Sequence, residues 1–279
     1  MREKTAMQLK DKIAIVTGST KGIGAKIVSV FAAEGARVVV TGRSTDAGSK
    51  VVAQIRATGG EAEFIAADIG SEDGVRQLLG ATIARFGGVD ILVNNAAAVE
   101  YIGQGGDKRV TELDTKDFDY IMKVGLYAPF WLCKHAIPEM QKRGGGAIVN
   151  ISSLASTHGL PGTPAYSCSK AALNGLTRQI AVDYAKDNIR SNCIVVGFIL
   201  SGDVADLFKG NAAFSEALNG ALLSRRSGET GDIANAALFL AAEQNLYVNG
   251  VCLPVDGGIQ ARSTLPDFSA LLGQLPRNQ

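Results

Sequence analysis

The sequence predicts a single α/β domain in which a doubly wound parallel sheet of about seven strands carries helices on both faces. Two observations support this fold class. Short β-branched segments alternate with longer, Ala-rich stretches of helical periodicity, and almost half of the 279 residues are hydrophobic, enough for one large core. The core is expected over about residues 10–259, between a polar N-terminal extension and a C-terminal tail that starts near Ala261.

Seven strands and seven helices follow one another along the chain. The predicted strands are Ile13–Val16, Val38–Val40, Ala62–Ile65, Ile91–Val93, Ala147–Ile151, Ile194–Val196 and Val251–Val255. The predicted helices cover residues 22–35, 46–58, 72–86, 115–143, 165–187, 203–222 and 230–242. In a parallel sheet of this kind, ligands bind beyond the carboxyl ends of the strands.

The composition favours a small-molecule partner. The net charge of +1 and the dispersed Lys and Arg residues indicate neither nucleic-acid binding nor a membrane surface. The polar N-terminus lacks a secretory signal, so a cytoplasmic protein is expected. Four isolated cysteines and two separated histidines predict no metal site and no disulfide: Cys133, Cys168, Cys193, Cys252, His135 and His158.

The first predicted strand runs directly into a glycine-rich turn and then a helix. The turn reads Thr17-Gly18-Ser19-Thr20-Lys21-Gly22-Ile23-Gly24. Glycines at these places let the backbone approach a pyrophosphate, which would sit at the positive end of the helix dipole. A nucleotide site is therefore predicted here, with a plain tight turn as the alternative.

Tyr166 and Lys170 form the second informative pattern. Residues four apart on a helix share one face, so the ammonium can lie close to the phenol. A nearby cation in a site shielded from water lowers the pKa of a tyrosine. The alternative is an amphipathic surface helix, on which the pair has no chemical role.

Taken together, these motifs resemble the short-chain dehydrogenase/reductase family, in which 3-oxoacyl-[acyl-carrier-protein] reductases are familiar members. The turn matches TGxxxGxG, Asn94-Asn95-Ala96 matches most of NNAG, Tyr166 and Lys170 match YxxxK, and Asp256-Gly257-Gly258 lies near the end of the core. The resemblance implies a Rossmann fold and hydride transfer with a nicotinamide cofactor. It implies that Tyr166 is the general acid/base, that Ser153 orients the substrate oxygen, and that Lys170 lowers the pKa of Tyr166 and binds the nicotinamide ribose. Ser152 is the alternative hydroxyl, but spacing favours Ser153.

The expected cofactor is NADP(H) rather than NAD(H). Gly42 occupies the place where an NAD enzyme usually has an Asp, and Arg43 follows it. Lys21 adds a second cation, although both could be solvated surface charges. The remaining cofactor-binding residues that the resemblance implies are Gly18, Ser19, Thr20, Gly22, Ile23, Gly24, Ser44, Asp68, Ile69, Asn95, Ala96, Gly197, Ile199 and Ser201, together with Tyr166 and Lys170. For Asp68, an acidic helix cap is the alternative.

The sequence departs from the family at several places. Gly125 occupies the position of an Asn that supports a proton relay, so a modified relay is expected; Ala97 and Val196 are smaller departures. The alternative is a nucleotide-sensing protein that has lost catalysis.

The substrate is less defined than the cofactor. Residues from Ser201 to about Ser227 are expected to cover it, with the apolar side chains Val204, Leu207, Phe208, Phe214, Leu218, Leu222 and Leu223. The alternative is that these side chains, at helical spacing, only pack the segment onto the domain. The opposite wall is expected to include Tyr101, Ile102, His158 and Leu160. Ketoacyl thioester, steroid, sugar and quinol substrates all remain open. The long helices at 115–143 and 165–187 resemble the family's pairing surface, and this resemblance implies a homodimer or homotetramer.

Overall fold

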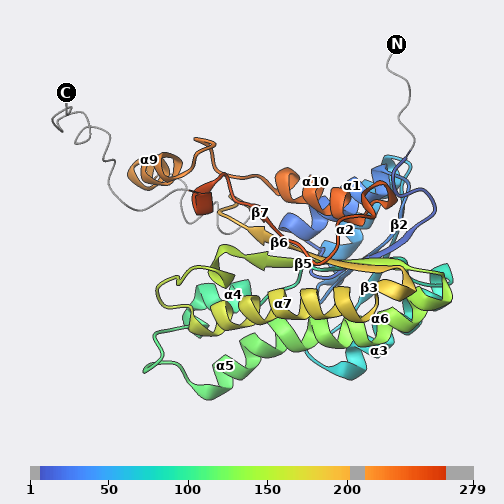
Figure 1. Cartoon of the computed structure of the whole chain (residues 1–279), viewed down its shortest axis with the longest axis horizontal. Helices are drawn as coiled ribbons and strands as arrows, with labels where there is room; N and C mark the ends of the chain where they lie inside the picture. Colours follow the sequence, from blue (N-terminus) through green and yellow to red (C-terminus); the bar gives the residue numbers. More distant parts are fainter. Residues whose placement is uncertain (1–6, 202–210, 262–279) are drawn as a thin grey trace, which may run out of the picture.

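The computed structural model describes residues 7–201 and 211–261. They contain one seven-stranded parallel sheet of order β3-β2-β1-β4-β5-β6-β7 (Figure 1). The strands are β1 (Ile13–Val16), β2 (Arg37–Gly42), β3 (Glu61–Ala66), β4 (Ile91–Asn94), β5 (Gly146–Ser153), β6 (Ile189–Val196) and β7 (Cys252–Val255). This sheet confirms the predicted fold class.

Helices cover both faces of the sheet (Figure 1). The α-helices are α1 (Gly22–Ala33), α2 (Thr45–Ala57), α3 (Glu72–Phe86), α4 (Val99–Tyr101), α5 (Thr115–Met122), α6 (Ala128–Lys142), α7 (Pro164–Asp183), α9 (Ala212–Ala221) and α10 (Thr230–Ala241). Short 3-10 turns are η3 (Leu154–Ser156), η4 (Ala185–Asp187), η5 (Glu243–Asn245) and η6 (Ile259–Ala261). One core packs α1, α2 and α10 on the sheet, and the other packs α3, α6 and α7 on its opposite face.

Strand β1 shows why the sheet needs helices on both sides. Its four residues are all fully buried. Ala14 and Val16 belong to the core under α1, whereas Ile13 and Ile15 belong to the core under α3 and α6. Successive side chains of a strand point to opposite faces, so an uninterrupted apolar segment requires cover on both.

Two predicted helices differ from the structure. The helix expected at 115–143 is divided into α5 and α6 by a π-helical turn, η2 (Lys123–Tyr127), which contains Gly125. The helix expected at 165–187 ends at Asp183 and continues only as η4. A π turn inserts an extra residue into the helix, a feature that hydrophobic periodicity alone does not reveal.

Part of the predicted substrate cover and of the tail lies outside the described residues. Val204, Leu207 and Phe208 fall in residues 202–210, and the tail falls in 262–279. Helix α9 is the described part of the helix predicted at 203–222. Among the described residues, no helix has both the length and the hydropathy to cross a membrane.

Candidate active site

The glycine-rich turn joins β1 to α1 at a point where side chains cannot fit. Gly18 has a φ of +61°, and a Cβ on Gly24 would lie 2.4 Å from the Gly18 carbonyl oxygen. Helix α1 begins without a side-chain capping hydrogen bond from Lys21. Backbone amides at such a helix start are donors for an anion, so the turn fits a dinucleotide pyrophosphate.

Asn95, directly after β4, fixes the shape of this turn. Its Nδ2 donates to the carbonyl oxygens of Thr17 at 2.8 Å and Gly18 at 3.1 Å. The Thr17 hydroxyl accepts in return from the backbone amides of Asn95 and Ala96. Strands β1 and β4 are neighbours at the point where the sheet order reverses, which is where α/β folds bind their ligands.

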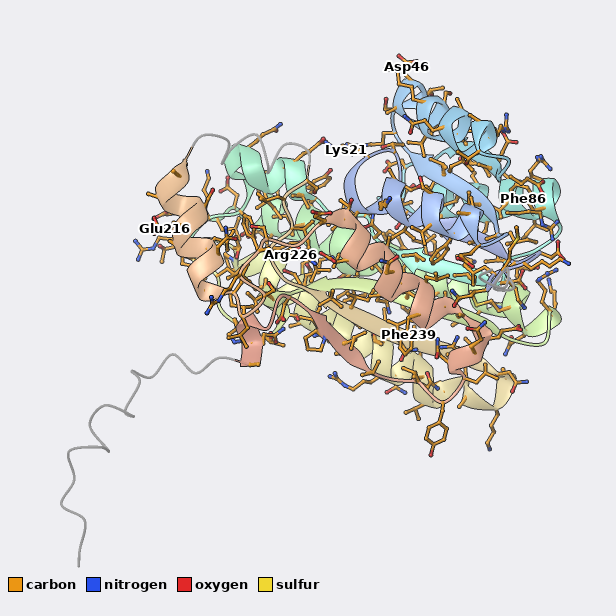
Figure 2. The ribbon with its side chains drawn as sticks, turned by 90° about the horizontal axis from the view of Figure 1, so that it is seen from above. Lys21, Asp46, Phe86, Glu216, Arg226 and Phe239 are labelled. Atoms are coloured by element: carbon orange, nitrogen blue, oxygen red, sulfur yellow. The ribbon has the colours of Figure 1, made fainter. Side chains whose placement is uncertain are left out.

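The two predicted phosphate-binding cations meet the same carboxylate. Lys21, labelled in Figure 2 at the start of α1, pairs with Glu100 of α4. Arg43 lies 3.7 Å from the other oxygen of Glu100. Sequence reasoning missed Glu100, because it is far from both cations along the chain.

Other predicted cofactor residues have mainly local partners. The buried Ser19 hydroxyl donates to the Val16 carbonyl at 2.6 Å and accepts from the Thr41 amide at 3.0 Å, so it links β1 to β2. Asp68 is exposed and accepts from the Gly70 amide at 2.9 Å. The side-chain cap of α3 is Ser71, so the alternative reading of Asp68 as that cap is wrong.

Several further predicted residues lie at the same edge of the sheet. Thr20 packs over Gly42 at the end of β2, which Arg43 and Ser44 follow, and Ser44 caps α2. Ile69 packs on the core under α3. Ser201 lies near Gly22, whose Cβ would be 3.8 Å from the serine Oγ.

Ser153, Tyr166 and Lys170 come together where β5 ends and α7 begins. Ser153 is the last residue of β5, and its side chain contacts Tyr166. Lys170 is buried, and its Nζ donates to the Ile151 carbonyl at 2.8 Å and lies 5.6 Å from the centroid of the Tyr166 ring. Ser152 instead points inward and donates to the Lys170 carbonyl at 3.2 Å. Of the two serines, Ser153 is the one beside the phenol.

The expected pKa of Tyr166 is not what the structure shows. Desolvation raises the pKa of the phenol, and the Ser153 side chain opposes this only in part. The buried Lys170 has its pKa lowered to about 8 by desolvation. Burial thus penalises both charged forms and outweighs the helical spacing from which a lowered tyrosine pKa was predicted.

Asp107 is a site residue that sequence reasoning passed over. This buried carboxylate accepts from the backbone amides of Ala165 at 3.3 Å and Tyr166 at 2.9 Å. It follows a π-helical segment, η1 (Ile102–Gly106), a loop that contains three glycines and begins directly after Tyr101. The Tyr166 ring packs in the same small apolar cluster as Tyr101 and Ile102. Asp107 therefore joins this loop to the amide of Tyr166.

Gly125 brings η2 close to α7. It is buried, and a Cβ at this position would lie 2.7 Å from the Oγ and 2.9 Å from the Cβ of Ser169. Ser169 is the residue before Lys170, and its hydroxyl donates to the Tyr166 carbonyl at 2.8 Å. The glycine is required by this helix contact, which explains why no larger side chain fits here without a shift.

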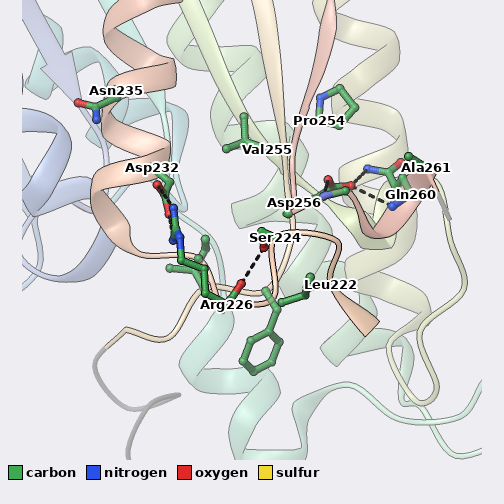
Figure 3. Close-up of a pocket in the computed structure, with 15 residues that line it drawn as sticks. Leu222, Ser224, Arg226, Asp232, Asn235, Pro254, Val255, Asp256, Gln260 and Ala261 are labelled. Carbon is green, nitrogen blue, oxygen red and sulfur yellow. Dashed lines mark hydrogen bonds and ion pairs between the residues drawn. The ribbon is translucent and has the colours of Figure 1, made fainter. Parts of the chain in front are cut away.

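A cavity of about 760 Å³ lies between the segment after β6 and the end of β7 (Figure 3). Its walls include the apolar Phe198, Ile199 and Leu222 and the polar Arg226 and Gln260. The cavity borders the loop after Ser153, because the hydroxyl of Thr157 is 2.9 Å from Oε1 of Gln260.

The loop after β6 and the opposite wall complete this edge. Gly197 allows a close approach, since its Cβ would lie 2.5 Å from the Asp256 Cα. Ile199 is buried and bridges to Gly228. His158 and Leu160 are exposed in the loop after Ser153.

The family model described as enoyl-(acyl carrier protein) reductase matches residues 18–260. These residues contain Gly18 to Gly24 of the glycine-rich turn, together with Asn95, Ser153, Tyr166 and Lys170. The chain belongs to the short-chain dehydrogenase/reductase family. It is an NAD(P)-dependent oxidoreductase that acts on alcohol or carbonyl groups.

Individual relatives span almost the whole chain. The 7alpha-hydroxysteroid dehydrogenase of Clostridium sardiniense is 38% identical over 251 residues, which cover 90% of this chain and 94% of that protein. A 7alpha-hydroxysteroid dehydrogenase structure with NADH and 7-oxo glycochenodeoxycholic acid is 36% identical, with a TM-score of 0.84 and coverage of 92% and 98%. A gluconate 5-dehydrogenase from Burkholderia cenocepacia, complexed with NADP and tartrate, is 29% identical, with a TM-score of 0.83 and the same coverage.

Proposed function

We propose that this short-chain dehydrogenase/reductase is an NADP(H)-preferring carbonyl reductase in which Tyr166 is the proton donor. The observation that carries the proposal is the contact between Ser153 and Tyr166 at the end of β5, with Lys170 buried one helical turn further along α7. A substrate oxygen that hydrogen-bonds to both hydroxyls is fixed and polarised at the same time.

Each of the three side chains has a separate role in the proposed reaction. A bound nicotinamide supplies or accepts the hydride. Ser153 donates a hydrogen bond to the substrate oxygen, and Tyr166 gives that oxygen its proton. Lys170 would hold the ribose hydroxyls of a bound cofactor. Burial raises the pKa of Tyr166 above its ordinary value, so the phenol keeps its proton and can donate it to a carbonyl oxygen. Alcohol oxidation requires the phenolate, so its rate should rise with pH.

The preference for NADP(H) rests on charge at the end of β2. Gly42 provides no carboxylate against a 2′-phosphate, and Lys21 and Arg43 lie within reach of one shared partner, Glu100. A planar guanidinium can bind two phosphate oxygens. The two solved relatives are bound to NADH and to NADP, so the fold accommodates either cofactor.

The substrate we propose is an amphipathic ketone. The cavity beside the Ser153 loop combines an apolar wall at Phe198 and Leu222 with the polar Arg226 and Gln260 (Figure 3). Ser153, Tyr166 and Lys170 do not line it, so we assign to it the part of the substrate away from the reacting carbonyl. One relative is named for a hydroxysteroid, which is mainly apolar, and another for gluconate, which is polar. An amphipathic ketone combines the two kinds of surface.

A substrate screen tests this function. The consumption of NADPH or NADH is followed by absorbance with 7-oxo bile acids, keto sugar acids, quinones and 3-oxoacyl thioesters, and Tyr166→Phe is the control. We expect saturable reduction of a bile-acid ketone, faster with NADPH and absent in the control. NADPH binding without turnover of any ketone would instead favour the nucleotide sensor.

We also propose a homodimer or homotetramer in the cytoplasm. Tyr127, Phe130 and Val182 are large apolar side chains on η2, α6 and α7 that are 51%, 47% and 75% exposed. Such a surface is expected to be covered by a second copy. Four cysteines without paired short spacings in the sequence are typical of a protein of a reducing compartment, which supports the cytoplasm. Light scattering that gives a monomer mass at micromolar concentration would contradict the assembly.

A further inference from the structure

Two cysteines face each other across the last pair of strands. Strands β6 and β7 lie side by side (Figure 1). Cys193 lies in β6 and Cys252 begins β7, and the two residues are Cα partners in the parallel ladder. Paired residues on neighbouring strands direct their side chains to the same face of the sheet. Neighbouring strands lie about 4.8 Å apart, within the roughly 4.4–6.8 Å range of Cα separations that a disulfide spans. The backbone can therefore accept a bond between these sulfurs.

The two thiols have opposite environments. Cys193 is fully buried, whereas Cys252 is partly exposed on the edge strand, with Nη1 of Arg178 3.7 Å from its Sγ. The Cys193 thiol and Arg178 lower the pKa of Cys252 to about 6, against its partial burial. The contact with Cys252, together with burial, raises the pKa of Cys193. Cys252 is thus the thiolate and the nucleophile of the pair.

A chain of hydrogen bonds leads from this pair to Ser153. The Cys193 thiol lies 3.2 Å from Oδ1 of Asn174, one turn after Lys170 on α7. Nδ2 of Asn174 donates to the Ser156 hydroxyl at 2.9 Å, and that hydroxyl donates to the Ser153 carbonyl at 2.6 Å. A thiol can donate to Asn174, but a disulfide sulfur cannot. Oxidation of Cys193 to a disulfide would therefore remove the first hydrogen bond of the chain that holds the backbone of Ser153.

We propose that Cys252 is an oxidation site for hydrogen peroxide and that Cys193 is its resolving thiol. The Cys252 thiolate attacks one peroxide oxygen, an S–O bond forms, the O–O bond breaks, and the departing hydroxide becomes water after taking up a proton. Cys193 then loses its proton and attacks the Cys252 sulfur, so that an S–S bond forms and a second water leaves. Two thiols are oxidised by two electrons in total, and one peroxide is reduced to two waters.

The test uses the full chain carrying Cys168→Ser, which removes the exposed thiol of α7. After peroxide treatment, peptide mapping without reductant should show Cys193 joined to Cys252, and turnover should fall and return with dithiothreitol. Cys252→Ser should resist inactivation. Cys193→Ser should retain a sulfenic acid at Cys252 that dimedone traps. Arg178→Gln should slow oxidation several-fold, and the buried Cys133 should stay free.

Two results would overturn the inference in distinguishable ways. If mapping shows both thiols free after peroxide inactivation, or if Cys252→Ser is inactivated as fast as its parent, there is no such site. If the disulfide forms but turnover is unchanged, the link to Ser153 is wrong. The mapping does not depend on the proposed function, whereas the turnover measurement rests on it and requires a ketone that the protein reduces.

Discussion

The turn after β1 and the site after β5 lie at the same edge of the sheet but are built differently. In the turn, glycines allow backbone atoms to approach where a Cβ on Gly24 would meet a carbonyl oxygen at 2.4 Å. After β5, buried polar groups replace glycines: Lys170 is fixed by the Ile151 carbonyl, and Asp107 accepts from the Tyr166 amide. The close contacts of the first region require glycines, with Asn95 and Thr17 holding its backbone, whereas the second region depends on buried polar side chains whose hydrogen bonds are satisfied.

This difference predicts how each region fails. A side chain added to the turn should block the cofactor while leaving the polar site assembled. A polar group removed near Tyr166 should leave the cofactor bound but impair proton transfer, because a buried donor without a partner costs about 1–3 kcal/mol. The Kd for the cofactor therefore reports on the turn, and kcat reports on the polar site.

The largest effect is expected for Gly24→Ala in the turn. The new methyl group would be 2.4 Å from the Gly18 carbonyl oxygen and 2.6 Å from Asn95 Nδ2. We expect about 10- to 100-fold weaker NADPH binding, which is about 1.4–2.8 kcal/mol. Fluorescence titration measures it. Gly80→Ala in α3, where nothing lies within 4 Å of the new Cβ, is the matched control and should bind normally.

Asp107→Ala should affect the polar site next most strongly. It removes the acceptor of the Ala165 and Tyr166 amides, so the start of α7 loses its support. We expect kcat to fall about tenfold, the equivalent of roughly 1.4 kcal/mol, with the Kd for NADPH unchanged. Asp114→Ala, at an exposed acidic residue before α5, is the control. An equal fall of kcat in both variants would contradict the role assigned to Asp107.

Gly125→Asn tests the contact between η2 and α7. The added side chain must displace Ser169, so we expect a loss of stability of about 1–3 kcal/mol and a several-fold fall in kcat. Urea unfolding and steady-state kinetics measure the two. A stable variant with higher turnover would show that the usual asparagine is compatible with this site and that the glycine is a defect.

The smallest effect is expected at Glu100, the carboxylate shared by the two cations. Glu100→Gln removes the negative charge that Lys21 and Arg43 share and that would repel a 2′-phosphate, so the KM for NADPH should fall about two- to fivefold while that for NADH stays unchanged. Arg43→Ala should raise the KM for NADPH far more than that for NADH. If both cofactors respond equally to these changes, the two cations do not select the phosphate.

The sequence was sufficient for features that depend on chain order. Alternating strands and helices identify the sheet, and the glycine spacing places a dinucleotide turn between β1 and α1. It could not reveal contacts between distant segments, such as Glu100 with Lys21, Asp107 with Tyr166, or Cys193 with Cys252. Nor could it show that desolvation raises the pKa of Tyr166, because helical spacing predicts the nearby cation but not how deeply the phenol is buried.

Tyr166→Phe is the most direct test of the central claim that this phenol supplies the proton. The change removes one hydroxyl and keeps the ring in its apolar cluster with Tyr101 and Ile102. Ketone reduction and NADPH binding should be measured on the same protein. We predict that kcat falls about 100- to 10,000-fold while the Kd for NADPH stays within twofold of the parent. Turnover close to that of the parent, with the cofactor bound normally, would contradict the account.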